Sequence, residues 1–320
     1  MILAVGSSVQ YEIDAYRKVA ECLERKGHKV VLFKQDKCLD GELFEFETKG
    51  SSSVSSVIID SAYYALDEFS AVWYIKPQLP EELLRYEPAE HGLFIRRQFR
   101  EMRMFLWSLL RDKIWIDDPW QIQIAENKPY QLKLTIDVGL RVPRTLITSE
   151  PRTVRKFYEE CNSRMIVKIL SPSPMLDYVI YTNRVTDEDM QHIDSTRQSP
   201  SIFQEYIDKD YELRVTVVGK EIFSAKIDSQ RDVETSIDWR KKPQLNDHGV
   251  KMESVKLPDH VTSKLLLFME RIGLRFGCID MIVTPEGEYV FLEINPNGQW
   301  YFVQLETGLE IATAIASLLC

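Results

Sequence analysis

The sequence predicts an α/β protein with an open parallel α/β domain at its N-terminus. Residues 2–5 form an apolar run typical of a strand, and apolar residues at helical spacing follow from Ile13 to Leu23. Gly27 ends this helical pattern, and Val30–Phe33 is typical of a second strand. Strand, helix and strand joined by short links favour a parallel sheet.

The rest of the first 115 residues predicts a hairpin, a buried strand and a long helix. Two runs rich in apolar residues flank a Lys-Gly-Ser-Ser turn within residues 43–60. Ala71–Ile75 is an apolar run that ends before Pro77, and residues 93–111 carry apolar side chains at helical spacing. The arginines of this helix are interpreted as a solvated face in preference to a binding site: Arg96, Arg97, Arg100 and Arg103. We expect an N-terminal domain over residues 1–115.

Two further lobes are expected, a central one over residues 116–204 and a C-terminal one over residues 205–320. Asn127 followed by Pro129 is a favourable helix start. The predicted helices are 127–138, 149–161, a short one from Thr186, 259–272 and 305–319. The predicted strands are Arg144–Ile147, Met165–Leu170, Tyr178–Thr182, Ile202–Tyr206, Tyr211–Val218 and Glu221–Asp228.

Composition limits the classes of protein to which the chain can belong. Its 320 residues, 44% hydrophobic and 28% charged, suit two or three ordinary globular domains. The net charge of −9 argues against a nucleic-acid partner and permits a basic peptide partner. Five scattered cysteines without a CxxC pair indicate thiols in a reducing compartment. No run approaches the ~20 apolar residues of a membrane span, so we expect a cytoplasmic protein.

A hairpin within residues 275–299 carries the most informative acids of the chain. Two apolar, β-branched runs flank Thr-Pro-Glu-Gly-Glu, and a two-residue turn at Glu286-Gly287 would place Asp280 opposite Glu293. Their Cβ atoms would then lie roughly 5 Å apart, with Asn295 on the same face. The two facing carboxylates would repel each other, and their neighbours are apolar. A hard divalent cation that binds oxygen ligands would neutralise this repulsion. The alternative is a surface hairpin with two solvated acids.

Two lysines are candidate phosphate ligands. Lys168 lies within the apolar run Met-Ile-Val-Lys-Ile-Leu, where a lysine is costly unless it meets an anion or extends to solvent. Lys128 follows a predicted N-cap, where the helix N-terminus also attracts phosphate. Either a phosphate ligand or an ordinary surface lysine would explain Lys128. The chain has no GxxxxGK[ST] loop.

Alternation along the strand 211–218 places Glu212 and Arg214 on one face and Leu213 and Val215 on the other. The polar face is either part of a site or an exposed strand face with an ion pair.

Together these segments resemble the ATP-grasp ligases, and most closely the maturases of microviridin-type peptides (graspetides), which are related to the ribosomal-protein glutamate ligases. The matching segments are Trp115-Ile-Asp-Asp-Pro, Asn127-Lys-Pro-Tyr-Gln-Leu, Phe203-Gln-Glu-Tyr-Ile, Glu212-Leu-Arg-Val-Thr-Val-Val-Gly, Asp238-Trp-Arg and Glu293-Ile-Asn-Pro-Asn-Gly-Gln-Trp. The sequence departs from this branch at Asp117 and Thr135, where the branch tends to have asparagine and alanine.

The resemblance implies an ATP-grasp fold that holds the nucleotide between two lobes, and it assigns a role to each candidate residue. The implied ATP-binding residues are Lys128 and Lys168 at the phosphates, Glu205, Tyr206 and Ile207 at the adenine, and Glu212 at the ribose. The implied Mg²⁺ ligands are Asp280, Glu293 and Asn295. Arg214 and Arg240 would face the γ-phosphate and the acyl phosphate, and Asp228 would position the nucleophile.

The implied reaction joins side chains of a ribosomally made precursor peptide. ATP would phosphorylate an Asp or Glu carboxylate, and a Ser or Thr hydroxyl would displace phosphate to form an ω-ester macrocycle. Formation of an ω-amide with Lys, addition of free amino acids to a peptide or protein tail, and a nucleotide-binding module without catalysis are the alternatives. The family further implies a homodimer and a helical leader segment of the precursor; we place a basic leader residue at Asp187, Glu188 and Asp189, whose acids equally suit an ordinary helix start.

Overall fold

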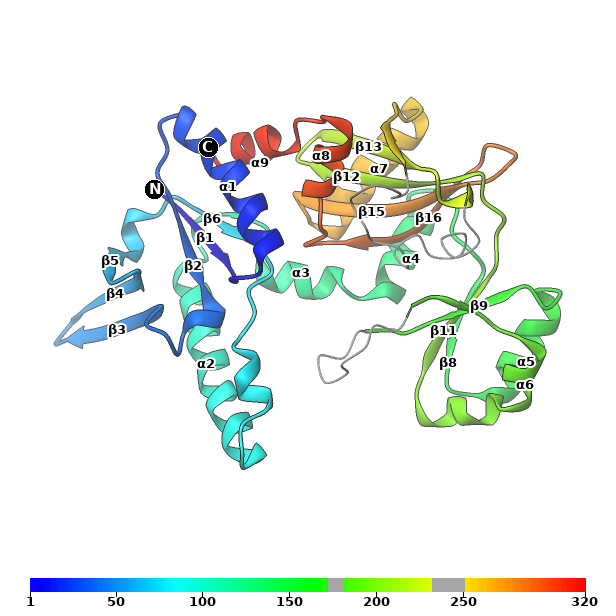
Figure 1. Cartoon of the computed structure of the whole chain (residues 1–320), viewed down its shortest axis with the longest axis horizontal. Coiled ribbons are helices and arrows are strands. Elements are labelled where there is room, and N and C mark those ends of the chain that lie inside the picture. The colour runs from blue at the N-terminus through cyan, green and yellow to red at the C-terminus, as the bar shows by residue number, and fades with distance from the viewer. Residues whose placement is uncertain (172–180, 232–250) are drawn as a thin grey trace.

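The part of the chain that the structure describes forms four sheets. The computed structural model describes residues 1–171, 181–231 and 251–320. An N-terminal parallel sheet and a large C-terminal antiparallel sheet lie side by side in Figure 1, and a smaller central sheet lies below the C-terminal one. A three-stranded hairpin sheet projects from the N-terminal region. The α/β prediction is therefore confirmed.

The N-terminal sheet is parallel throughout and has the strand order β2-β1-β6-β7. Alternation in β1 sends Ile2 and Ala4 toward one core and Leu3 and Val5 toward another, so both faces are covered. The first core contains α1 and the C-terminal helix α9, and the second contains α2. The strands are β1 (Ile2–Gly6), β2 (Val30–Lys34), β6 (Ala71–Tyr74) and β7 (Ile114–Ile116), and the helices are α1 (Gln10–Arg25) and α2 (Ala89–Leu109).

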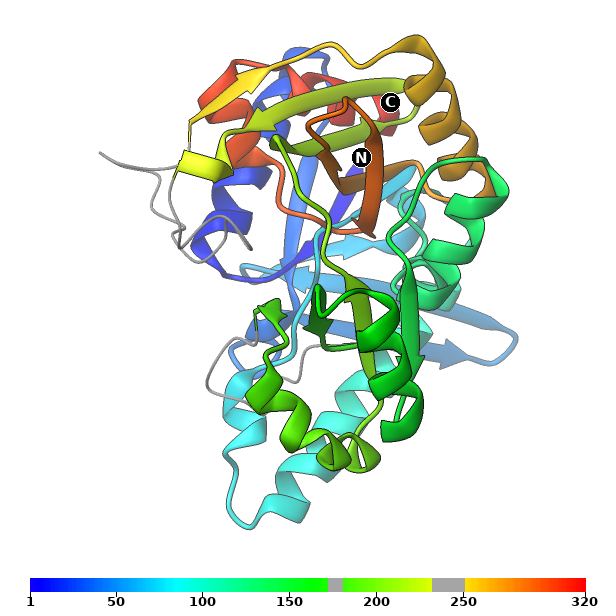
Figure 2. The same cartoon turned by 90° about the vertical axis from the view of Figure 1, so that its right-hand side faces the viewer.

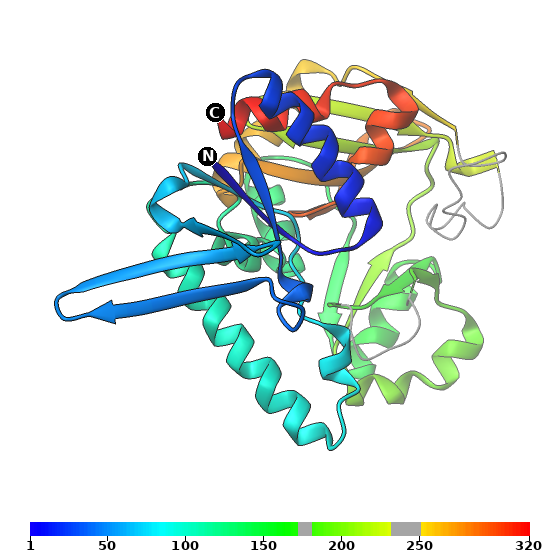
Figure 3. The same ribbon diagram turned by 60° about the vertical axis from the view of Figure 1, so that its left-hand side comes forward.

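The predicted hairpin of residues 43–60 forms and gains a third strand. Its strands are β3 (Leu43–Lys49), β4 (Ser52–Ile59) and β5 (Ala62–Ala65). Figure 3 shows this hairpin extending away from the body, while α2 runs in a different direction beneath it. Phe44 and Phe46 pack edge-on against Phe105 of α2, with ring centroids 5.7 and 4.9 Å away, and so join the base of the hairpin to the helix.

The central sheet is antiparallel and small. Its order is β10-β9-β11-β8, with α5 packed on it through Val154 and Phe157. Its strands are β8 (Thr145–Thr148), β9 (Met165–Lys168), β10 (Asn183–Arg184) and β11 (Ser201–Glu205), and its helices are α5 (Pro151–Glu160) and α6 (Asp187–Gln191). Two helices lead into it, α3 (Pro119–Ala125), which was not predicted, and α4 (Lys128–Asp137). Most of the predicted strand 178–182 lies outside the described residues.

The C-terminal sheet has one apolar face and one polar face. In β12, Leu213, Val215 and Val217 pack against α7, and Glu212 and Arg214 point the other way, as predicted. Its order is β14-β13-β12-β15-β16, formed by β12 (Tyr211–Val218), β13 (Glu221–Ile227), β14 (Met252–Ser254), β15 (Phe276–Val283) and β16 (Tyr289–Asn295), with α7 (Asp259–Ile272) on the apolar face.

The turn of the β15–β16 hairpin differs from the prediction. Thr284 and Glu288 close a three-residue loop instead of a two-residue turn, and Gly287 adopts a left-handed φ of 81°. This change alone would shift every pair by one residue. An irregularity between Asp280 and Met281 restores the expected pairing of Asp280 with Glu293. The predicted facing pair is confirmed, although the predicted turn was wrong.

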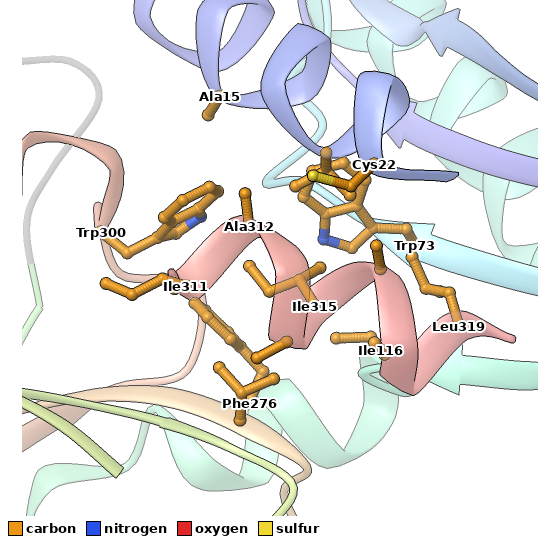
Figure 4. Packing of buried hydrophobic residues seen from close by; sticks show 14 of the residues in the cluster. Ala15, Cys22, Trp73, Ile116, Phe276, Trp300, Ile311, Ala312, Ile315 and Leu319 are labelled. Atoms are coloured by element: carbon orange, nitrogen blue, oxygen red, sulfur yellow. The ribbon is translucent and has the colours of Figure 1, made fainter. Parts of the chain in front are cut away.

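The predicted helix 305–319 is two helices, α8 (Tyr301–Thr307) and α9 (Ile311–Leu319). Gly308 ends α8 in a left-handed conformation with φ 71°. Helix α9 then crosses to α1, where Ile315 and Leu319 pack with Trp73 of the N-terminal sheet and Phe276 of the C-terminal sheet (Figure 4). The first and last helices of the chain therefore share one core.

None of the helices formed by the described residues has the length and apolar character needed to cross a membrane. The five cysteines all lie in the described part of the chain, and none of them forms a disulfide.

Candidate active site

An arginine holds Asp280, a predicted metal ligand, on the polar face of the C-terminal sheet. Asp280 accepts hydrogen bonds from Arg214 Nη1 at 2.8 Å and from Asn295 Nδ2 at 3.0 Å, and Glu293 lies directly opposite in the strand register. Arg214 also donates to the carbonyl of Gln299 at 2.8 Å. Burial lowers the pKa of Arg214, but the Asp280 carboxylate helps to outweigh burial and the pKa is raised overall. The guanidinium is therefore a fixed positive charge in the site.

Glu293 is held by the first turn of α4. Lys128 Nζ donates to Glu293 Oε2. One turn further on, the buried Gln131 donates to the carbonyls of Ala125 and Ile294 at 2.7 and 2.9 Å and accepts from the Ile294 amide at 3.0 Å. Gln131 thus fixes α4 to β16, and this contact places Lys128 beside Glu293.

The donor set fits a magnesium ion bound together with a nucleotide. Asp280 and Glu293 offer carboxylate oxygens and Asn295 an amide oxygen, which are ligands that Mg²⁺ prefers. Over residues 1–171, 181–231 and 251–320, no three His, Cys, Asp or Glu side chains gather as a metal cage. Such a partial site is typical of Mg²⁺ that completes its coordination with substrate phosphates and water.

A cleft of about 710 Å³ opens beside these acids and reaches the central sheet. In Figure 2 the C-terminal sheet lies above the central sheet, and the chain passes between them from β11 to β12. Asp280 and Glu293 line the cleft together with the predicted ATP-binding residues Lys168, Glu205, Tyr206, Ile207 and Glu212. Residues predicted from distant parts of the sequence are therefore brought together, and Lys128 lies next to them through Glu293.

Next to the predicted adenine segment lies a residue that the sequence analysis missed. Glu205 Oε1 accepts a hydrogen bond from the Arg144 amide at 2.9 Å, so one oxygen of its carboxylate is bound to the backbone. The preceding Gln204 lines the cleft, and its Nε2 donates to Thr145 Oγ1 at 3.0 Å. Gln204 Oε1 is buried and has no partner among the described residues, which leaves an acceptor suited to an amino group in the cleft. The sequence offered no signal for it besides its place beside Glu205.

Glu212 forms an ion pair in the cleft with Lys209, a residue that the sequence analysis did not single out. Lys209 Nζ lies 2.6 Å from Glu212 Oε1, and only 6% and 10% of the two side chains are exposed. Burial raises the pKa of Glu212, and the charge of Lys209 opposes that shift. The sequence signal was the three-residue spacing of a lysine and a glutamate at the start of β12. Lys209 is a second cation, after Lys168, that lines the cleft.

A larger polar chamber adjoins the cleft at Asp280. It has a volume of about 1460 Å³, and its charged lining residues are Lys76, Glu126, Lys128, Arg214 and Asp280. Its wall includes the segment from Asn295 to Gln299. Tyr11 of α1 supports the end of this wall, because its hydroxyl accepts from the amides of Tyr301 and Phe302 at 2.7 and 3.2 Å. Burial raises the pKa of Tyr11 to about 12, so the hydroxyl stays neutral.

Two predicted catalytic residues are not among the described residues that line this site. Asp228 follows β13 and is outside the residues that line the cleft and the chamber, and Arg240 lies outside the described residues. Of the acids at the start of α6, Asp189 caps the helix by accepting from the amide and hydroxyl of Thr186, and Asp187 accepts from the Tyr158 hydroxyl at 3.0 Å. The helix-start interpretation explains Asp189, whereas Asp187 joins α6 to α5 and Glu188 is exposed.

Comparison with known proteins assigns this architecture to a family. The RimK-like ATP-grasp domain family matches residues 125–319, which include every described residue of the predicted metal and phosphate sites. The chain belongs to the RimK-like ATP-grasp family. This is a family of ATP-dependent carboxylate ligases. Alpha-aminoadipate–LysW ligase LysX of Sulfurisphaera tokodaii is 26% identical over 189 residues, which is 56% of this chain and 62% of that relative.

Solved structures extend the similarity to the whole chain. Macrocyclase MdnC of Microcystis aeruginosa MRC, bound with precursor peptide MdnA, superposes with a TM-score of 0.86 at 29% identity, covering 99% of this chain and 98% of MdnC. The RiPP-associated ATP-grasp ligase of Chryseobacterium gregarium, in complex with ADP and leader and core peptides, has a TM-score of 0.85 at 27% identity, covering 100% and 96%. Macrocyclase MdnB of Microcystis aeruginosa MRC has a TM-score of 0.80 at 30% identity, covering 99% and 98%.

Proposed function

We propose that this chain is an ATP-dependent peptide macrocyclase. It phosphorylates Asp or Glu side chains of a ribosomally made precursor peptide and joins them to Ser or Thr hydroxyls as ω-esters. The observation that carries this proposal is the meeting of the cleft and the polar chamber at Asp280. A carboxylate in the chamber would reach the γ-phosphate of a nucleotide in the cleft. Similarity to MdnC and MdnB over nearly the whole chain supports a peptide as the substrate.

The cleft would hold ATP with its phosphates toward the two acids. Lys128 and Lys168 would neutralise phosphate oxygens, since Lys128 already holds Glu293 and Lys168 lines the cleft. The adenine would lie at the Glu205–Ile207 segment, where Gln204 Oε1 offers an acceptor to its amino group. Glu212 would take the ribose hydroxyls. Bound at Asp280, Glu293 and Asn295, Mg²⁺ would supply charge neutralisation for the phosphates.

The chemistry proceeds in two displacements. An oxygen of the peptide carboxylate attacks the γ-phosphorus, the bond to the β-phosphate oxygen breaks, and ADP leaves. A hydroxyl oxygen then attacks the acyl carbon, loses its proton and expels inorganic phosphate. Arg214 is placed by Asp280 and Gln299 to face negative charge in both steps. Positioning of both peptide side chains in one chamber supplies much of the rate.

The proposed partner is a leader-bearing precursor peptide. We propose Asp187, Glu188 and Asp189 as the site for a basic leader residue, with Glu188 the most available because Asp187 accepts from Tyr158 of α5 and Asp189 caps the helix. We further propose that the protein forms a homodimer in the cytoplasm and that its domains meet near residues 115 and 204.

A second candidate reaction is amide formation. The relative LysX is named as an alpha-aminoadipate–LysW ligase, which favours ligation of an amino acid as the second candidate. Amide formation with a Lys side chain of the peptide, or addition of free amino acids, would use the same cleft. An ester and an amide are distinguished by mild alkaline hydrolysis, which opens the ester ring and leaves the amide intact.

The decisive experiment replaces Glu293 with glutamine. Purified protein is incubated with ATP, Mg²⁺ and a synthetic peptide encoded by a short open reading frame beside the gene and rich in Thr and acidic residues. Wild type is expected to release ADP and to remove one water from the peptide per ring, as read by mass spectrometry. Glu293→Gln is expected to lower turnover by roughly 100-fold or more, because a metal-ligand charge is lost.

Glu286→Gln is the matched control, because Glu286 is an exposed acid in the turn of the same hairpin. It should retain wild-type turnover. Unchanged kinetics of Glu293→Gln would remove Glu293 from the site. Wild-type turnover driven by free glutamate would favour the amino-acid ligase, and nucleotide binding without turnover on any carboxylate would favour a non-catalytic module.

A further inference from the structure

Helix α2 carries a row of arginines that the proposed reaction does not use. Arg96, Arg100 and Arg103 share one face of the helix, because residues three and four positions apart are neighbours. The row is roughly 10 Å long at the helical rise of 1.5 Å per residue. Arg100 lies 3.9 Å from Glu101, but both side chains are more than 60% exposed, so this pair neutralises the row only weakly.

At the inner end of the row, the guanidinium of Arg103 carries its charge in surroundings that disfavour it. Arg103 Nη1 donates to the carbonyl of Pro77 at 3.4 Å, and its guanidinium lies 5.1 Å from the ring centroid of Trp107. Its Nε is buried and has no hydrogen-bond partner among the described residues. Burial lowers the pKa of Arg103, and the like charges of Arg96 and Arg100 add to that effect. A cation in such surroundings is more stable when an anion approaches.

The inner end of the row is connected to the polar chamber through Pro77 and Lys76. Pro77, which Arg103 contacts, directly follows Lys76, and Lys76 lines the chamber. Lys76 has a left-handed φ of 41°, an uncommon conformation for a residue with a side chain. Its charge acts on the carboxylates of Glu12 and Glu126, where it opposes the rise in pKa that burial causes. The charges of Arg103 and of Glu126, which lines the chamber, both act on the hydroxyl of Tyr74.

We propose that Arg96, Arg100, Arg103 and Lys76 form a basic track that binds an acidic segment of the peptide and directs it into the chamber. This inference rests on the proposed function and identifies where the substrate lies before it reacts. Charge complementarity supports an acidic occupant, because this strip of cations stands out on a chain with a net charge of −9. Guanidinium groups also match the geometry of carboxylates. A peptide with several Asp and Glu side chains would pair with the cations of the track. It would also supply the carboxylate that the reaction phosphorylates.

The test measures binding of two fluorescein-labelled peptides by fluorescence anisotropy. One is a dodecapeptide of Asp, Glu, Ser and Gly, and the other has every acid replaced by its amide. We expect wild type to bind the acidic peptide more tightly and to lose this preference as salt is raised. The double variant Arg96→Gln/Arg100→Gln should weaken binding of the acidic peptide by roughly three- to thirtyfold, as expected for the loss of two partly exposed charge pairs.

Arg97→Gln is the matched control. Arg97 is exposed and adjacent to Arg96, but it lies about 100° away around the helix, outside the row. The control should bind the acidic peptide like wild type. The inference is overturned if the double variant binds like wild type, if Arg97→Gln weakens binding equally, or if wild type fails to prefer the acidic peptide. Equal binding of a twelve-residue oligothymidine would reveal a general polyanion surface and would also overturn it.

The same samples separate this inference from the proposed function. Binding of ATP and Mg²⁺ is measured by calorimetry for wild type and for the double variant, and both should bind nucleotide alike because neither Arg96 nor Arg100 lines the cleft. Absence of nucleotide binding in wild type would overturn the proposed function, while the anisotropy titration would still decide whether the track selects acidic peptides.

Discussion

At the scale of single residues, Asp117 is a buried acid that supports β15, the strand that carries Asp280, the proposed metal ligand. Its two carboxylate oxygens accept hydrogen bonds from the amides of Arg275 and Phe276 at 2.9 and 2.8 Å, at the start of β15. Only 4% of the residue is exposed, and burial raises its pKa from 3.8 to about 7 despite these two hydrogen bonds. Its charge state therefore depends on pH near neutrality.

This raised pKa predicts a pH dependence of stability. Between the unfolded and folded pKa values the folded state binds more protons, so this residue's contribution to stability is present at low pH and is lost as pH rises through 7. We expect the free energy of unfolding of wild type to fall relative to Asp117→Asn by roughly 1–4 kcal/mol between pH 5 and pH 8. Urea unfolding of both proteins at several pH values measures this difference. A difference that is constant with pH would contradict the raised pKa.

The residues of the site that could be predicted from the sequence are those governed by strand alternation. Asp280, Glu293 and Asn295 share a face because the side-chain period of a strand is two. Gln204 and Gln131 could not be predicted in the same way. Their importance comes from hydrogen-bonding groups left open or from partners more than 150 residues away, such as Ile294 for Gln131.

At the scale of elements, the loop after β16 brings backbone against the site arginine. A Cβ added at Gly298 would lie 2.8 Å from Arg214 Nη2 and would also press against Cys278. Glycine is therefore required here for close approach, and not for an unusual φ. The sequence contained this glycine in the Asn-Pro-Asn-Gly-Gln segment, but the contact depends on β12, which lies far away in the chain.

Gly298→Ala should displace Arg214 without unfolding the protein. We expect kcat to fall by roughly 10- to 100-fold, because a shift of about 1 Å in a positioning group has an effect of that size, while KM for ATP changes less. Steady-state ADP release measures both constants. Gly287→Asn is the control, because no atom lies within 4 Å of an added Cβ in that turn and asparagine tolerates its left-handed φ. A wild-type kcat for Gly298→Ala would show that Arg214 does not act in the reaction.

At the scale of the whole molecule, the two ends of the chain are packed together. Helix α9 contacts α1, and its Ile315 is fully buried among residues of the N-terminal sheet and of β15 (Figure 4). The apolar pattern of residues 305–319 predicted a helix, but a pattern within one segment does not identify its partner. The tertiary contact between residues about 290 positions apart, such as Cys22 and Thr313, could not be predicted for that reason.

This shared core predicts that a cavity in α9 weakens both sheets. Ile315→Ala should lower the free energy of unfolding by about 2–5 kcal/mol, as for other fully buried isoleucines. Because the core joins β1 and β6 to β15, amide hydrogen exchange should accelerate in all three strands by a similar factor. Leu305→Ala on α8 is the control, since that side chain is 61% exposed and its loss should change stability by less than about 0.5 kcal/mol. Faster exchange in β15 alone would mean that the N-terminal sheet unfolds independently of the C-terminal sheet. The two sheets would then be in contact through α9 without unfolding cooperatively.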